Sequence, residues 1–262
     1  MTGGRALVTG AGTRLGRAMA LRLAARGQAV AVHYNASRAA AEEVVDAIRA
    51  AGGIAHALQA DLLDEAATQA LVPAAAEALG GPLTVLINNA SIFEHDDIRS
   101  GTRESWDRHM ESNLRAPVVL TQRFAEAAPD PLIEAPREEP LAQALVVNMI
   151  DQRVRKLTPE FMSYTIAKMG LWAFTRTAAQ ALAPRVRVNA IGPGPTMRGA
   201  RQSEQHFTDQ RRATVLQRGS SPEDIVHALD YFLDARAVTG QLLCIDGGQH
   251  LGWRTPDVLG VE

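Results

Sequence analysis

Seven short runs of aliphatic and β-branched residues alternate along the chain with longer segments of helical periodicity. Two strands joined through a helix form a right-handed crossover, which makes the strands parallel and covers the sheet with helices. The alternation therefore predicts an α/β, doubly wound fold with a seven-stranded parallel sheet and helices on both faces. The predicted strands cover residues 5–9, 29–34, 54–59, 83–88, 144–148, 185–190 and 241–245.

The composition fits a single domain over residues 1–262 with a short C-terminal extension, residues 250–262. Apolar residues make up 46% of the chain and charged residues 21%, so the chain can bury a sizeable core. We find no internal repeat and no linker rich in Gly, Ser or Pro that would divide it. The proline- and acid-rich segment 129–140 is predicted to be a surface loop between a helix and the fifth strand.

Two other segments each admit two interpretations. Residues 198–218, rich in arginine and glutamine, form either a mobile lid or a solvated helix. Residues 253–262 extend past the last strand, and they either cover a neighbouring subunit's pocket or form a frayed terminus.

The charge and the cysteine count argue against several classes of protein. A net charge of -2 and a pI near 6.4 lack the clustered basic excess typical of nucleic-acid binding, so no nucleic-acid partner is expected. Cys244 is the only cysteine, which rules out an intrachain disulfide and argues against a metal site. The sequence shows no secretory segment and no membrane-spanning apolar run, so we expect a soluble, cytoplasmic protein.

A glycine-rich loop, residues 9–16, directly follows the first predicted strand and leads into a helical pattern. Glycines let the backbone turn sharply and approach a pyrophosphate, whose charge the N–H groups at the helix start stabilise. A purely structural tight turn is the alternative. The position of the loop favours a Rossmann-type dinucleotide site, with these cofactor-binding candidates: Gly10, Thr13, Arg14, Leu15 and Gly16.

The end of the second predicted strand indicates which dinucleotide binds. A carboxylate here would bind the ribose hydroxyls of NADH, but the sequence offers Tyr34, Asn35, Ser37 and Arg38 instead. A hydroxyl and a guanidinium, together with Arg14, favour the 2′-phosphate of NADPH. Past the third strand, the pair Asp61-Leu62 also belongs to the predicted cofactor site, where Asp61 binds the adenine amino group or caps a helix.

Tyr164 and Lys168 are four residues apart, which places both side chains on one face of a helix. Lysine is rare here, with two lysines against 25 arginines, so the choice of lysine is informative. A neighbouring ammonium lowers the pKa of a phenol, so Tyr164 is predicted to be a general acid. The alternative is a solvated surface pair.

Together these pieces resemble the short-chain dehydrogenase/reductase family across nearly the whole chain. The matching motifs are the loop 9–16, Asp61-Leu62, Asn88-Asn89-Ala90, Asn113, the Tyr164/Lys168 pair, Pro193-Gly194 and Asp246-Gly247-Gly248. The resemblance implies that Tyr164 donates the proton, that Lys168 binds the nicotinamide ribose, that Asn113 holds a relay water and that Asn89 lies beside the cofactor. It also implies a homotetramer built on helices around residues 103–128 and 157–182.

One position departs from the family pattern. The family usually has a serine 13 residues before its tyrosine, where this chain has Asp151. An ionised aspartate only accepts hydrogen bonds and repels a developing alkoxide, so ordinary ketone reduction is disfavoured. A ring C=N bond flanked by N–H and amino donors suits a carboxylate better, because the nitrogen is protonated as the carbon receives hydride.

The pteridine reductases are a similar branch of that family. The shared features here are Arg14 in the glycine loop, Asp151, and the run Asn88-Asn89-Ala90-Ser91-Ile92-Phe93. In that branch a phenylalanine and the nicotinamide hold the pterin between them, which makes Phe93 the candidate here. The resemblance also implies that Ser91 and Arg14 serve both cofactor and substrate, and that Pro193, Gly194 and Thr196 lie near the cofactor.

The sequence thus predicts NADPH-dependent reduction of a dihydropterin, with Asp151, Tyr164, Lys168 and Asn113 as catalytic residues. Two alternatives stay open: a carbonyl reductase of the same family, and a non-catalytic NADP-binding regulator. The choice among monapterin, biopterin and folate depends on loops 94–104 and 198–216.

Overall fold

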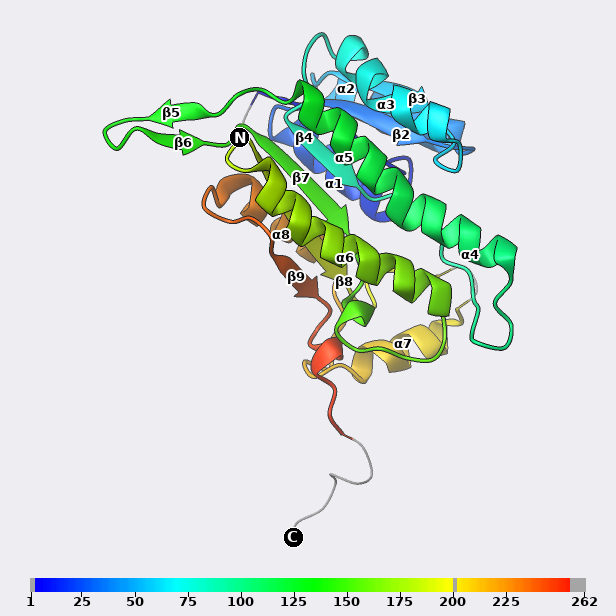
Figure 1. Ribbon diagram of the computed structural model, residues 1–262. Coiled ribbons are helices and arrows are strands. Elements are labelled where there is room, and N and C mark those ends of the chain that lie inside the picture. Colours follow the sequence, from blue (N-terminus) through cyan, green and yellow to red (C-terminus); the bar gives the residue numbers. More distant parts are fainter. Residues whose placement is uncertain (1–2, 200–201, 255–262) are drawn as a thin grey trace.

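Seven parallel strands form one sheet in the computed structural model, which describes residues 3–199 and 202–254 (Figure 1). The strand order is β3-β2-β1-β4-β7-β8-β9, which confirms the predicted doubly wound fold. The strands are β1 (Arg5–Val8), β2 (Ala29–Tyr34), β3 (Ala55–Gln59), β4 (Val85–Asn88), β7 (Ala144–Met149), β8 (Val186–Pro193) and β9 (Leu242–Ile245). Strand β8 extends to Pro193, beyond the predicted end at residue 190, because β7 and β9 both pair with it.

Helices cover both faces of the sheet, as predicted (Figure 1). The helices are α1 (Arg14–Ala25), α2 (Arg38–Ala50), α3 (Glu65–Ala78), α4 (Arg103–Met110), α5 (Ala116–Ala127), α6 (Met162–Leu182), α7 (Glu204–Arg212) and α8 (Pro222–Asp234). A π-helical turn, η1 (Glu111–Arg115), joins α4 to α5. Two short 3-10 helices, η2 (Gln152–Val154) and η3 (Gln249–Leu251), follow β7 and β9. Among the helices that the structure describes, none combines the length and the apolar character needed to cross a bilayer.

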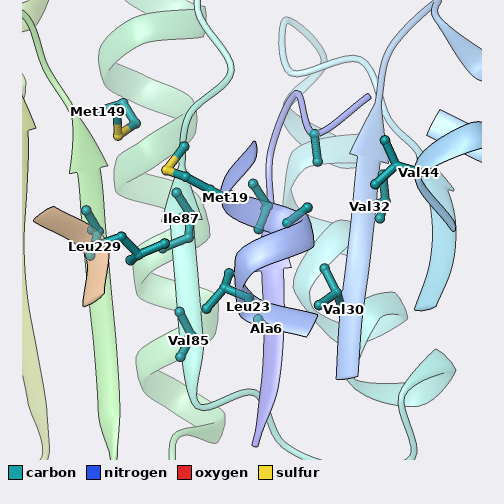
Figure 2. Close-up of a cluster of buried hydrophobic side chains, with 14 of the residues drawn as sticks. Ala6, Met19, Leu23, Val30, Val32, Val44, Val85, Ile87, Met149 and Leu229 are labelled. Atoms are coloured by element: carbon teal, nitrogen blue, oxygen red, sulfur yellow. The ribbon is translucent and has the colours of Figure 1, made fainter. Parts of the chain in front are cut away.

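The alternation of side chains along each strand divides the core between the two faces. Ala6 of β1 packs with Met19 of α1, Val44 of α2 and Leu229 of α8 on one face (Figure 2). Leu7, the next residue, packs on the other face with residues of α3, α5 and α6. These core side chains are almost fully buried, and each buried aliphatic side chain contributes about 1.5 to 3 kcal/mol to folding.

The order of the strands creates the crevice in which the candidate site lies. After β1 the chain builds β2 and β3 on one side, and it then crosses to place β4 on the other side of β1. The loops that follow β1 and β4 therefore start beside each other at the carboxyl edge of the sheet, the usual ligand position in doubly wound folds. Thr9 joins them, because its hydroxyl oxygen accepts hydrogen bonds from the backbone of Asn89 and Ala90, both at 2.9 Å.

The structure corrects the prediction for residues 129–140. Instead of a loop, this segment contains an antiparallel hairpin of β5 (Leu132–Glu134) and β6 (Glu139–Leu141), which projects from the body (Figure 1). Prolines and acidic residues are depleted in strands, so the composition of this segment predicted a loop and not a hairpin. Pro140 is tolerated because β6 is an edge strand, where one missing N–H costs little.

The two segments with open interpretations have different outcomes. Residues 204–212 of the 198–218 segment form the helix α7, capped by Ser203, whose hydroxyl accepts the backbone N–H of His206 at 3.1 Å. No residue of α7 is fully buried, but Phe207 and Gln210 are partly buried and line a cavity together with Tyr164. The segment is thus helical, and both the lid and the solvated-helix interpretation stay predictions. The interpretation of residues 253–262 falls largely on residues 255–262, which lie outside the described residues.

Candidate active site

The N-terminus of α1 opens into a cavity of about 510 Å³. Thr13 precedes α1 and its side chain makes no capping hydrogen bond, so the first N–H groups of the helix stay available to an anion. Gly16 allows the tight turn, because a Cβ there would lie 2.2 Å from the carbonyl oxygen of Gly10. The predicted cofactor residues that line this cavity are Gly10, Thr13, Arg14, Leu15, Gly16, Asn35, Asp61, Leu62, Asn89, Ala90 and Ser91.

His33, for which the sequence predicted no role, connects three segments around this cavity by hydrogen bonds. Its Nδ1 accepts the backbone N–H of Gly10 at 3.0 Å, so its Nε2 carries the proton and donates to the carbonyl of Ala60 at 3.1 Å. Burial lowers the pKa of His33 to about 4, so the ring is neutral at physiological pH. One buried imidazole thereby links the ends of β1, β2 and β3.

Ser37 and Arg38, two of the residues predicted to bind the 2′-phosphate, lie at the start of α2, outside the walls of this cavity. The Ser37 side chain makes no capping hydrogen bond, and Arg38 is exposed, 3.6 Å from Glu42. Both groups fit an anion, and their role stays a prediction. Tyr34 is partly buried and packs against the core beneath α1 and α2, and its contact with the cofactor stays a prediction.

A second cavity of about 340 Å³ adjoins the first, because Arg14, Leu15, Asn89 and Ser91 line both. Its walls bring together Phe93 from the loop after β4, Asp151 after β7, and Tyr164 with Lys168 on α6. Pro193 and Gly194, at the end of β8, also line it. The predicted catalytic and substrate-binding residues thus line one cavity, except Asn113, which is fully buried in the π-helical turn and does not line it.

Asp151 and Tyr164 are in direct contact. The Tyr164 phenol donates a hydrogen bond to Oδ2 of Asp151 at 3.1 Å, and the backbone N–H of Arg153 donates to Oδ1 at 2.8 Å. Burial raises the pKa of the Asp151 carboxyl above its ordinary value. Burial and the charge of Asp151 also raise the pKa of Tyr164 well above that of a free phenol. The Tyr164 phenol therefore holds its proton more tightly than a free phenol does.

This result corrects the expectation that Lys168 lowers the pKa of the phenol. The Lys168 ammonium donates to the carbonyl of Met149 at 2.8 Å and lies 5.7 Å from the centroid of the Tyr164 ring. Burial lowers the pKa of Lys168 to about 8. Desolvation and Asp151 dominate the environment of the phenol, and the lysine does not offset them.

Phe93 stands at the wall of the second cavity. Its ring stacks on Phe161 with 4.2 Å between centroids and 7° between planes, and it meets the Tyr164 ring edge-on at 4.7 Å. The side chain is 46% exposed. The stack fixes the plane of a ring that borders the Asp151 and Tyr164 pair.

Three other predicted side chains make contacts within the protein. The Asn113 side chain, in the π-helical turn, bonds the backbone N–H and carbonyl of Ile92 at 3.0 and 2.8 Å. The Thr196 hydroxyl bonds Ser220 at 2.5 Å. The Arg14 guanidinium donates to the carbonyls of Met197 and Arg198 at 3.0 and 2.9 Å. Asn113 thus holds the segment that carries Ser91 and Phe93, and Arg14 holds the segment before α7.

A glycine loop at the switch point of a doubly wound sheet, beside buried Tyr164 and Lys168 and the adjoining Asp151, defines a dinucleotide-dependent oxidoreductase. A family model described as enoyl-(acyl carrier protein) reductase matches residues 10–250. The chain belongs to the short-chain dehydrogenase/reductase family, as predicted from its motifs. Within residues 3–199 and 202–254, no group of His, Cys, Asp and Glu side chains is arranged to hold a metal ion.

Comparison with known proteins gives relatives of more than one activity. The crystal structure of FolM alternative dihydrofolate reductase 1 from Brucella canis, complexed with NADP, is 42% identical, with a TM-score of 0.89 and coverage of 97% of each chain. An uncharacterized oxidoreductase of Methylorubrum extorquens is 34% identical over 93% of this chain and 96% of its own length. The 3-oxoacyl-[acyl-carrier-protein] reductase FabG of Staphylococcus aureus is 30% identical over 94% of this chain and 98% of its own.

Proposed function

We propose that this chain, an NADP-dependent oxidoreductase of its family, reduces a dihydropterin to the tetrahydropterin. The contact between Asp151 and Tyr164 carries the proposal, because it puts a carboxyl where a ketone reductase needs a neutral hydroxyl donor. The 42% identity to FolM alternative dihydrofolate reductase 1 supports the same substrate class.

The residues of the first cavity fit the cofactor. The uncapped start of α1 and the loop around Gly10 would hold the pyrophosphate, and Ser37 with Arg38 would hold the 2′-phosphate. Lys168 would hold the nicotinamide ribose. The cofactor, when bound, supplies the hydride that a pterin ring carbon receives.

The residues of the second cavity supply the proton and the orientation. Asp151 accepts hydrogen bonds from the amino and ring N–H groups of the pterin, and it aims the ring nitrogen at the Tyr164 phenol. Tyr164 gives its proton to that nitrogen, and Lys168 with Asn113 resupplies it. The Asn113 side chain is already hydrogen-bonded to the backbone of Ile92. The backbone of Asn113 would therefore hold the relay water.

The Phe93 ring forms one wall of the pterin slot. An aromatic face against a flat heterocycle adds about 0.5 to 1.5 kcal/mol beyond burial. Ser91 and Arg14 line both cavities, so either can contact cofactor and substrate together.

The test is an assay of the purified protein with NADPH and a panel of dihydropterins, ketones and 3-oxoacyl thioesters, followed by the loss of NADPH absorbance. Faster turnover of dihydrobiopterin, dihydromonapterin or dihydrofolate than of any ketone supports the proposal. Turnover of ketones alone makes the protein a carbonyl reductase, the second candidate, which the 30% identity to FabG favours. NADPH binding without oxidation by any substrate indicates a non-catalytic regulator.

The proposed assembly is a cytoplasmic homotetramer built on α4, α5 and α6. Exposed apolar side chains on α4 and α6 support it, because Trp106, Ile166 and Met169 are 37%, 41% and 39% exposed. Light scattering on the eluate of a sizing column measures the mass directly, and a monomer there would end this part of the proposal.

A further inference from the structure

A buried aspartate outside both cavities joins the loop after β4 to the start of α6. Asp96 is 1% exposed, and its Oδ1 accepts the backbone N–H of Ser163 at 3.2 Å. Its Oδ2 accepts the Ser163 hydroxyl, and its backbone carbonyl accepts the N–H of Met162 at 3.2 Å. These bonds satisfy two of the N–H groups that the first turn of a helix leaves without partners.

The start of α6 depends on these hydrogen bonds from Asp96, because the residue before the helix makes no capping hydrogen bond of its own. Phe161, the residue before α6, has a φ of 57° and makes no side-chain capping hydrogen bond. A left-handed backbone is strained for a bulky residue, and it persists only where the surroundings impose it. Asp96 therefore supplies the capping hydrogen bond that the N-cap residue Phe161 does not make, although it lies 67 residues before Ser163 in the sequence.

His109 of α4 completes the cluster. Its Nε2 accepts the backbone N–H of Glu94 at 3.1 Å, so Nδ1 carries the proton and donates it to the Ser163 hydroxyl at 2.6 Å. Ser163 then donates to Asp96, and each polar group has a partner. Ser163 is fully buried and lines neither cavity, which separates this cluster from a nucleophilic triad.

The two segments that the cluster joins carry the two halves of the active site. Phe93 lies between Ile92, which Asn113 holds, and Glu94, which His109 holds. Tyr164 directly follows Ser163. We propose that Asp96, Ser163 and His109 are positioning residues, which set the separation between the Phe93 ring and the Tyr164 phenol. Because both side chains line the second cavity, where the substrate would bind, the effect on catalysis rests on the proposed function.

The variant Ser163→Ala tests this role by removing the central hydroxyl and leaving the helix backbone intact. Asp97→Asn is the matched control, because Asp97 is the next residue along from Asp96 and its hydrogen bonds lie at the surface. Amide hydrogen exchange is measured over residues 92–98 and 162–168. Ser163→Ala removes the two buried hydrogen bonds of the hydroxyl, with His109 and with Asp96. Their loss should speed exchange about tenfold or more in both segments, whereas Asp97→Asn should change it little.

Kinetics separate positioning from general stability. We expect the KM for dihydropterin to rise about tenfold in Ser163→Ala, while the KM for NADPH stays within about twofold. A purely structural role would lower kcat and the number of NADPH sites together, with both KM values unchanged. Ser163→Thr retains the hydroxyl and should restore the KM for dihydropterin.

Unchanged exchange in both segments, or a KM for dihydropterin equal to that of Asp97→Asn, would overturn the proposal. If Ser163→Ala does not fold, Asp96→Asn is measured the same way, because it keeps one acceptor and the shape of the side chain. If the wild-type protein reduces no dihydropterin, the proposed function fails, and the exchange data still decide whether the cluster joins the two segments.

Discussion

The phenol oxygen of Tyr164 lies 3.1 Å from Oδ2 of Asp151 and donates a hydrogen bond to it. In a reductase that acts on ketones, a neutral hydroxyl beside the tyrosine would donate to the substrate oxygen. Here burial and the carboxyl raise the pKa of the phenol, so Tyr164 keeps its proton until a basic nitrogen is placed against it. This relationship favours the proposed reduction of a C=N bond over the reduction of a ketone.

Replacing Asp151 should remove turnover and spare cofactor binding. We expect Asp151→Ala to lower kcat for dihydropterin by about 100-fold or more, since both orientation and proton delivery depend on the carboxyl. Asp151 lines only the second cavity, so the affinity for NADPH should change by about twofold at most. Steady-state kinetics and a fluorescence titration with NADPH measure the two effects. Near-normal turnover would remove Asp151 from the chemistry.

Removing the Phe93 ring should weaken substrate binding more than turnover. The loss of an aromatic face, about 0.5 to 1.5 kcal/mol, corresponds to a KM for dihydropterin about 2- to 13-fold higher in Phe93→Ala. The control Phe93→Tyr retains the ring and should bind dihydropterin normally. An equal KM in both variants would show that the ring does not contact the substrate.

The ionisation of Lys168 should set the alkaline limb of the pH profile. Burial lowers its pKa to about 8, so the ammonium is present below that pH and is lost above it. If Lys168 resupplies the proton, kcat should be level up to about pH 8 and then fall about tenfold per pH unit. Lys156 is exposed, so Lys156→Met should leave the profile unchanged. A level kcat through pH 10 would exclude Lys168 from the relay.

His33 should make stability depend on pH in mildly acidic solution. Its pKa in the folded protein is about 4, below its ordinary value of 6.5, so between these values the unfolded chain binds the proton more tightly. The contribution of His33 is thus complete above pH 6.5 and falls by about 3 kcal/mol as the pH drops to 4. Urea unfolding at several pH values should show a weaker dependence in His33→Gln, and parallel curves for the two proteins would contradict the account.

Several parts of this structure could be predicted because their signals are local in sequence. The aliphatic runs gave all seven strands of the sheet, and the 13-residue spacing between Asp151 and Tyr164 joined a strand end to a helix. The cap of α6 could not be predicted, because Asp96 is distant in sequence and Phe161 gives no capping signal. The raised pKa of Tyr164 could not be predicted either, since it depends on how deeply the phenol is buried beside the Asp151 carboxyl.

We propose above all that the Asp151 carboxyl binds the pterin and directs its ring nitrogen to Tyr164. A crystal structure of the protein with NADP and a dihydropterin would locate these groups relative to one another. We predict the pterin ring stacked against Phe93, with its amino and ring nitrogens within about 3 Å of the Asp151 carboxyl oxygens and the Tyr164 phenol. A pterin bound elsewhere, or an Asp151 side chain turned away from it into solvent, would contradict the account.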